Sequence, residues 1–146
     1  MDFGEVTAVW LTLRLLLLLP LTALLVRLLP LPLTLRLLTP RRLPQTAASS
    51  AEIERLVQAV DALQSLRLPL YRRTCLRRCL VLLRLLRQRG LPVVLHFGVR
   101  RVGQQLEGHS WLTLRGELFL EPGEDPRPHY TVTYRWPEDT LWSQRL

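Results

Sequence analysis

The sequence predicts an α+β fold in which a helix that carries a cysteine packs on a small antiparallel sheet, behind a leucine-rich helical N-terminal region. Three observations lead to this fold class. Apolar residues recur at helical spacing in several stretches before residue 90. Beyond Gly90 they follow the pattern of strands. Helices followed by a run of strands are typical of α+β domains, and a length of 146 residues suits one domain.

Residues 6–38 form the leucine-rich N-terminal region, which is strongly apolar but interrupted by charge. A membrane span needs about 20 apolar residues, whereas the longest uncharged run here is the twelve residues 15–26. Three arginines interrupt the region and three prolines are expected to break its helices: Arg14, Arg27 and Arg36, and Pro20, Pro30 and Pro32. We therefore expect short amphipathic helices that cover the core or dock on a partner. A helix lying in a membrane interface with snorkelling arginines is an alternative, and a true span is another.

The stretch that follows, TPRRLPQTAASS, is polar, contains two prolines and is typical of a linker. Ser49 and Glu52 then have the spacing of a capping box, so a helix is predicted to begin here and to end near Gln64. We divide the chain accordingly. Residues 1–47 are the Leu/Arg-rich helical region with its linker, and residues 48–146 are the domain expected to carry the chemistry.

A connector at residues 66–74 leads to a second helix, predicted from Cys75 to about Arg89. Gly90 with Pro92 just beyond it is a common helix ending. The predicted apolar face consists of Leu76, Cys79, Leu80, Leu83 and Leu86, with Arg77, Arg84 and Arg87 turned elsewhere.

After Gly90 the pattern predicts strands over residues 93–99, 108–114, 117–121 and 130–136. Arg115-Gly116 is a tight-turn signal between the second and third strands. We expect the four strands to form an antiparallel meander.

The chain is strongly basic, with a formal net charge of +8, and all 20 of its basic side chains are arginine. A basic chain can bind nucleic acid, an anionic membrane or an acidic partner. Its low aromatic content and the lack of a nucleic-acid-binding motif argue against nucleic acid. Two cysteines without a second pair suggest a reducing compartment, and the acidic start MDFGEV does not resemble a signal peptide. A cytoplasmic protein is therefore expected.

Cys75 is the candidate nucleophile because it lies at the predicted N-terminus of a helix. The free N–H groups and the helix dipole at that position favour an anion. Four arginines, Arg72, Arg73, Arg77 and Arg78, are close in sequence, and positive charge favours the thiolate. Cys79, one turn further along the apolar face, suits a structural role.

A thiolate nucleophile needs a base, and histidine is the usual one. Of the three histidines, His96 lies among apolar strand residues, where we expect a hydrogen-bonded core or face residue, and His129 lies in a proline-rich turn, where we expect it to be exposed. His109 begins a predicted strand, and the hairpin at Arg115-Gly116 can bring Glu121 beside it. Glu121 would then orient the His109 ring as the third member of a triad does.

The segment from CLRRCLVLLRLLRQRG through LPVVLHFGVRR to GHSWLTLRGELFLEPGE resembles the leader peptidases of lasso-peptide biosynthesis, which are bacterial transglutaminase-like cysteine peptidases. The resemblance covers roughly residues 50–135. It rests on four matches in order, with an acid twelve residues after the histidine: Cys75-Leu76, Arg89-Gly90, Gly98-Val99, His109-Ser110-Trp111 and then Glu121.

The resemblance implies a transglutaminase/papain-like core with Cys75, His109 and Glu121 as catalytic residues. It implies a peptidase that removes the leader from a ribosomally made precursor peptide. It also implies two partners, a small leader-recognition protein and an ATP-dependent macrolactam synthetase. Many relatives have Asp where this chain has Glu121, so Asp125 is an alternative third member, and Ser110 stands where Ala is usual.

Three other functions remain open at this stage. The first is a metal site built from Cys75, Cys79, His109 and His96, although no paired CxxC spacing supports it and we expect no metal or cofactor. The second is a transglutaminase-like acyltransferase that uses the same triad. The third is a non-enzymatic interaction protein held at a membrane by residues 6–38.

Overall fold

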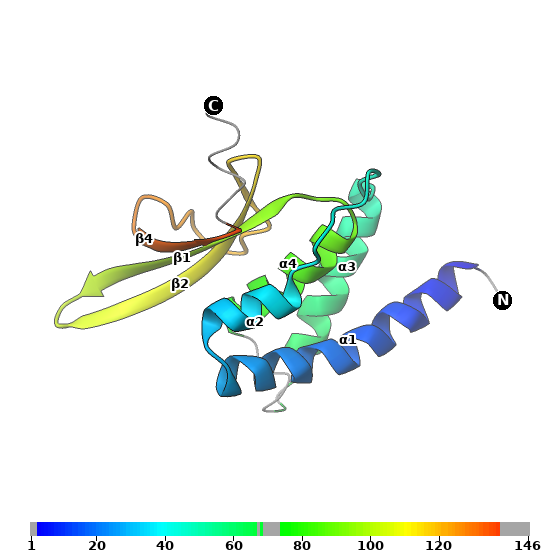
Figure 1. Cartoon of the computed structure of the whole chain (residues 1–146), viewed down its shortest axis with the longest axis horizontal. Helices are drawn as coiled ribbons and strands as arrows, with labels where there is room; N and C mark the ends of the chain where they lie inside the picture. Colours follow the sequence, from blue (N-terminus) through cyan, green and yellow to red (C-terminus); the bar gives the residue numbers. More distant parts are fainter. Residues whose placement is uncertain (1–2, 67, 69–73, 138–146) are drawn as a thin grey trace.

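The computed structural model describes residues 3–66, 68 and 74–137, so most of the expected connector at residues 66–74 lies outside the described part. The described residues form four helices and then four strands. The helices lie together beside one sheet (Figure 1), which confirms the α+β prediction. In chain order the elements are α1 (Phe3–Leu28), α2 (Leu31–Leu38), α3 (Ser50–Gln64), α4 (Cys75–Gln88), β1 (Val93–Val102), β2 (Gln105–Leu114), β3 (Glu117–Phe119) and β4 (Thr131–Trp136).

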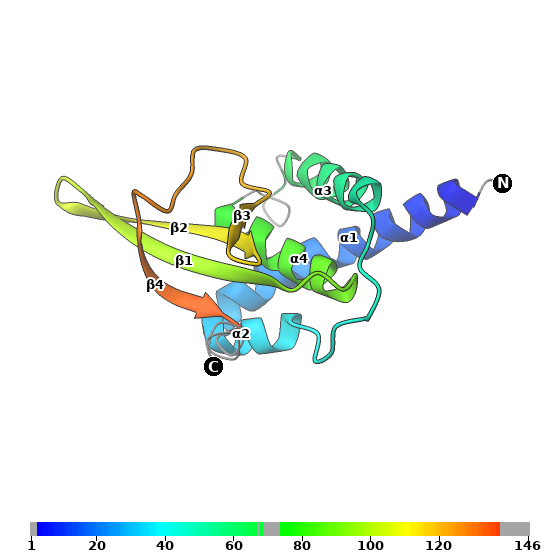
Figure 2. The same cartoon turned by 90° about the horizontal axis from the view of Figure 1, so that it is seen from above.

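Helix α4 is the centre of the molecule, because it packs against α1, α2, α3 and the two long strands (Figure 2). Its side chains are therefore buried on nearly every side, not along a single face. The expectation that Arg87 turns away from the core is wrong. Arg87 is buried, and its Nη1 donates a hydrogen bond to the Val93 carbonyl at 2.9 Å.

Helix α1 runs through Pro20 without a break, so the expectation that this proline ends a helix is wrong. A proline inside a helix costs about 3 kcal/mol, whereas each fully buried leucine contributes about 1.5–3 kcal/mol. Leu15, Leu18 and Leu19 of α1 are buried in the main core, which is enough to offset one proline. Pro30 is the N-cap of α2 and separates it from α1, whereas Pro32 does not break a helix, because it lies in the first turn of α2, where a missing N–H costs nothing.

The outer side of α1 is apolar and uncovered. Trp10 is 64% exposed, Leu17 76% and Leu28 69%. Glu5–Leu28 has a mean hydropathy of 2.2 and is the one helix among the described residues long and apolar enough to cross a membrane, judged by length and composition only. Core helices and signal sequences share these two properties. The other side of α1 packs against α3 and α4.

The predicted ends of α3 and α4 are confirmed. Ser49 and Glu52 form the capping box, with the Ser49 N–H donating to Glu52 Oε2 at 3.2 Å and the Glu52 N–H to Ser49 Oγ at 3.3 Å. Helix α4 is followed by Gly90, whose φ of +81° lies in the left-handed region that glycine adopts readily. A Cβ at Gly90 would lie 2.7 Å from the Thr46 carbonyl oxygen. Glycine at this position therefore also allows the linker backbone to pack closely against the turn.

The sheet has the strand order β3-β2-β1-β4 and is antiparallel throughout. The expected meander is therefore wrong for β4, which pairs with β1 and not with β3. Burial explains the choice, because Tyr134 and Trp136 of β4 pack against the main core beside β1. The β1–β2 hairpin is also longer than predicted and turns at Gly103, which has a φ of +60°.

The two faces of the sheet differ. Val93, Leu95 and Leu112 face α4 and belong to the main core. The opposite face carries His96 and Trp111, which are register partners, and then His109, the partner of Gly98. This row of three rings leads along that face to the site described below.

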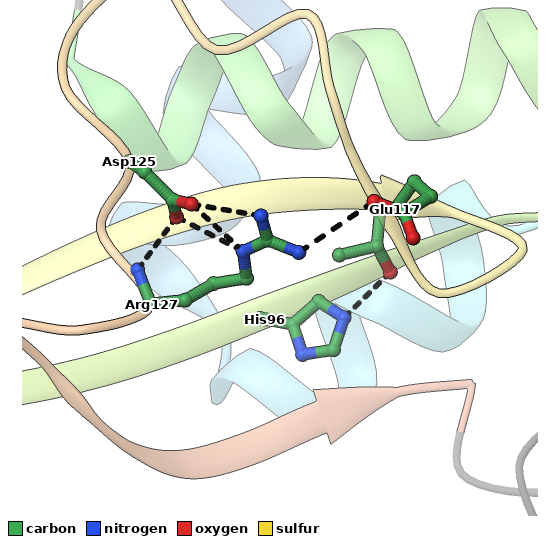
Figure 3. A network of polar contacts seen from close by, with 5 residues as sticks. His96, Glu117, Asp125 and Arg127 are labelled. Carbon is green, nitrogen blue, oxygen red and sulfur yellow. Dashed lines mark hydrogen bonds and ion pairs between the residues drawn. The ribbon is translucent and has the colours of Figure 1, made fainter.

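His96 is a buried, hydrogen-bonded residue, as the sequence predicted. Its Nε2 lies 2.7 Å from Thr113 Oγ1 (Figure 3), and burial, followed by the charge of Arg135, lowers the pKa of His96 to about 4. Between about pH 6.5 and pH 4 the unfolded chain therefore binds a proton at His96 that the folded chain does not.

We accordingly expect the free energy of unfolding to fall by about 2 kcal/mol between pH 7 and pH 5 on account of His96. His96→Gln keeps a hydrogen-bonding group opposite Thr113 but does not titrate. Urea denaturation at the two pH values should therefore show a smaller difference for His96→Gln than for wild type. Equal pH dependence in the two proteins would contradict the expectation.

Candidate active site

The three predicted catalytic residues lie around one pocket. Cys75 comes from the start of α4, His109 from β2, and Glu121 from the segment after β3. The pocket has a volume of about 270 Å³. Its other lining residues are Thr74, Arg78, Cys79, Ser110 and Pro122.

Cys75 is the first residue of α4 and is half-buried. Thr74 caps the helix, since its Oγ1 accepts a hydrogen bond from the Arg77 N–H at 3.2 Å. The N–H groups of Cys75 and Leu76 also belong to the first turn, which has no acceptors within the helix. Cys75 thus lies at the positive end of the α4 dipole.

Cys79 differs from Cys75 in every respect that matters for reactivity. It is buried, with 4% of its surface exposed, and belongs to the main core. This burial raises the pKa of the Cys79 thiol. Cys79 therefore suits the structural role expected for it.

His109 and Glu121 are in direct contact, with 3.2 Å between His109 Nε2 and Glu121 Oε1. An ionised carboxylate only accepts, so the contact requires the proton on Nε2. Nδ1 is then the nitrogen that can accept a proton. The Arg115-Gly116 hairpin that makes this contact possible is confirmed, with φ values of +51° and +84°.

Glu121 reaches His109 because β3 is short. The β2–β3 pairing covers only Leu112 to Leu114 on β2, which leaves the β2 edge at His109 outside it. Leu120 then adopts a φ of +58°, in the left-handed region that costs a non-glycine residue roughly 1–2 kcal/mol. Arg78 stabilises this turn, since its Nη1 donates to the Leu120 carbonyl at 2.9 Å. Sequence reasoning named Arg78 only as a positive charge near Cys75 and missed Leu120, because neither residue belongs to a recognisable motif.

Two aromatic rings flank the His109 imidazole. Trp111 stacks on it, with ring centroids 6.1 Å apart, and Tyr130 lies against it at 5.4 Å. Trp111 is itself stacked on His96 at 5.7 Å and is almost completely buried. Gly98 permits this arrangement, because a Cβ there would lie 2.8 Å from the Trp111 ring. Trp111 thus packs beside the site, and Tyr130 was not predicted from the sequence.

Asp125, the alternative third member, is engaged elsewhere. Its carboxylate binds the Arg127 side chain at 2.7 Å, and Arg127 also approaches Glu117 (Figure 3). The hydrogen bonds from Arg127 hold the pKa of Asp125 below its ordinary value. Of the two acids, Glu121 is the one in contact with His109.

A matched pair of amide substitutions tests this assignment. We expect Glu121→Gln to lower kcat for peptide cleavage by roughly 10²–10⁴-fold, because an amide does not hold the imidazole tautomer as a carboxylate does. Asp125→Asn should retain at least about half of the wild-type kcat. Steady-state kinetics on the two variants shows which acid is the third member of the triad. A larger loss of kcat in Asp125→Asn than in Glu121→Gln would show that the assignment is wrong.

A second hollow, with a volume of about 220 Å³, adjoins the Cys75 pocket at the His109–Glu121 pair. The two hollows share these two residues. His129 is exposed, as predicted, and lines the second hollow together with Arg100 and Tyr130. The Arg100 guanidinium lies 4.9 Å from the Tyr130 ring centroid, so Arg100 helps to hold Tyr130 in place.

The four residues considered for a metal site are not gathered around one point. His96 is bound to Thr113 and stacked on Trp111, on the sheet face opposite the main core that contains Cys79. Among the described residues, no group of three or more His, Cys, Asp or Glu side chains is placed to hold a metal ion.

Comparison with known protein families agrees with this geometry. The transglutaminase-like superfamily matches residues 15–135, which is most of the chain and includes Cys75, His109 and Glu121. No curated protein and no solved structure matches the chain. The match extends to the superfamily and not to the narrower lasso-peptide group. It also begins within α1, so part of the leucine-rich region is included in the matched domain. The chain belongs to the transglutaminase-like superfamily.

Proposed function

We propose that this protein is a cysteine peptidase that removes the leader from a ribosomally made lasso-peptide precursor. The observation that carries the proposal is the shared pocket of Cys75, His109 and Glu121, with His109 bonded to Glu121 at 3.2 Å. Membership of the superfamily supports cysteine peptidase or acyltransferase-like chemistry. The leader-peptidase assignment rests on the ordered matches from Cys75-Leu76 to His109-Ser110-Trp111.

The proposed reaction has two steps. The Cys75 thiolate attacks the carbonyl of the scissile bond, and the Cys75 N–H stabilises the oxyanion that forms. Protonated His109 gives its proton to the leaving amine, which departs and leaves a thioester on Cys75. His109 then removes a proton from water, and the resulting attack releases the acid and the free thiol. Glu121 stabilises the imidazolium during both steps.

The proposal includes partners and a location. We propose that the peptidase works in the cytoplasm with a small leader-recognition protein and an ATP-dependent macrolactam synthetase. The uncovered apolar side of α1 supports the need for a partner, because soluble monomers rarely leave so contiguous an apolar surface open.

The direct test mixes the purified chain with its genome-neighbour precursor peptide and recognition protein and follows peptide mass. Loss of the leader mass and appearance of the free core peptide are the expected results. An intact precursor after prolonged incubation with folded wild-type protein would contradict the proposal.

A transglutaminase-like acyltransferase is the second candidate, because the superfamily match and the same triad support it equally. In that reaction an amine instead of water attacks the thioester. Adding a primary amine to the assay separates the two. Acyl transfer gives a product that is heavier than the free acid by the mass of the amine minus the mass of water. Hydrolysis gives the free acid itself.

A non-enzymatic membrane-associated protein is the third candidate, and Glu5–Leu28 is the observation that favours it. Such a protein would bind vesicles and leave the precursor uncut. Vesicle binding together with cleavage would instead indicate a peptidase that contacts the membrane peripherally through residues 6–38.

A further inference from the structure

Arg78 is a buried arginine in the wall of the Cys75 pocket, and the reaction proposed above gives it no part. Burying a guanidinium is costly unless its N–H groups meet acceptors. The contacts that satisfy this charge therefore show which parts of the molecule Arg78 holds together.

Arg78 joins three elements. Its Nε donates to Asp61 Oδ1 on α3 at 2.8 Å, and its Nη2 donates to Asp61 Oδ2 at 3.4 Å. Its Nη1 donates to the Leu120 carbonyl at 2.9 Å. Arg78 itself belongs to α4, one turn after Cys75. The side chain thus connects the nucleophile helix to the residue that precedes Glu121.

Leu120 determines where Glu121 points. Its backbone is in the left-handed region, with a φ of +58°, and the chain leaves the β3 direction at this residue. A carbonyl that accepts from a fixed guanidinium cannot rotate freely, so the hydrogen bond holds the left-handed turn in place. Relaxation of the turn to a negative φ would redirect the Glu121 side chain away from His109.

We infer that Arg78 is a positioning residue that holds Glu121 against His109 through the Leu120 carbonyl, with Asp61 fixing the guanidinium. The kinetic consequence of this inference rests on the proposed function, whereas its structural consequence does not. The competing explanation is that Arg78 only ties α3 to α4 and has no influence on the Glu121–His109 pair.

A double-mutant cycle separates the two explanations. We expect Arg78→Lys to lower kcat by about 10- to 100-fold, because lysine keeps the charge but cannot bind Asp61 and Leu120 together. In a Glu121→Gln background the same change should cost less than about threefold, since the contact it supports is already impaired. An equal loss in both backgrounds would overturn the inference.

Arg84→Lys is the matched control. Arg84 is also on α4 and also donates to a backbone carbonyl on another segment, Leu38, at 3.2 Å. It lies outside the Cys75 pocket. Arg84→Lys should change kcat by less than about twofold relative to its parent protein in both backgrounds. A loss of kcat as large as that of Arg78→Lys would show that any hydrogen bond from an α4 arginine to another segment has the same effect, and would overturn the inference.

The ¹⁵N shifts of the His109 imidazole supply a readout that needs no activity. In spectra recorded at a pH high enough to leave the ring neutral, wild type and Arg84→Lys should show the proton on Nε2, whereas Arg78→Lys should show a mixture of tautomers. An unchanged tautomer in Arg78→Lys would overturn the inference. If wild type cleaves no peptide, the proposed function fails while this measurement still decides the role of Arg78. Asp61→Asn, which loosens the same guanidinium, replaces Arg78→Lys if that variant does not fold, with the same expectations.

Discussion

Replacing Cys75 with alanine is expected to lower the rate of leader cleavage by at least about 10³-fold, leaving only catalysis that needs no covalent intermediate. Alanine has no nucleophile, so the thioester cannot form. The fold should persist, because Cys75 is only half-buried at the first position of α4 and lies outside the main core. The measurement is peptide mass against time, with thermal unfolding to show that the variant is folded.

Cys79→Ala is the matched control on the same helix. Cys79 also lines the pocket, but it is buried, and burial raises the pKa of its thiol, which disfavours the reactive thiolate. Its replacement should lower the free energy of unfolding by about 1 kcal/mol through lost packing and leave kcat within about twofold. Iodoacetamide at neutral pH should correspondingly label Cys75 well before Cys79. Full activity in Cys75→Ala would end the peptidase proposal.

Much of the site could be predicted because its signals are local. Gly90 with Pro92 beyond it marks the end of α4 from sequence alone. The Arg115-Gly116 turn sets the register that places Glu121 near His109. These features depend on a few neighbouring residues, and the structure has them where the sequence indicated.

The features that were not predicted depend on tertiary packing. Pro20 remains inside α1 because burial of leucines on one side of that helix offsets the lost hydrogen bond. Strand β4 pairs with β1 because its aromatic side chains complete the core there. Arg78 and Arg87 are buried because α4 is surrounded on nearly all sides, which helical periodicity in one segment cannot reveal.

His109→Ala should also lower cleavage by at least about 10³-fold, because no other group in the pocket can both accept the thiol proton and return one to the leaving amine. The loss should differ in kind from that of Cys75→Ala. The thiol is still present in His109→Ala, so raising the pH should recover part of the acylation rate, whereas Cys75→Ala should not respond. Comparing pre-steady-state acylation at pH 7 and pH 9 measures this difference.

His129→Ala is the matched histidine control. His129 is exposed and lines the second hollow but not the Cys75 pocket, and its removal should leave kcat within about threefold. The two histidines thus differ in the one property that the mechanism requires, which is access to the Cys75 pocket with a carboxylate behind the ring. If His129→Ala proved the more damaging variant, the base would have to act from the second hollow, and the pairing of His109 with Glu121 would have no catalytic meaning.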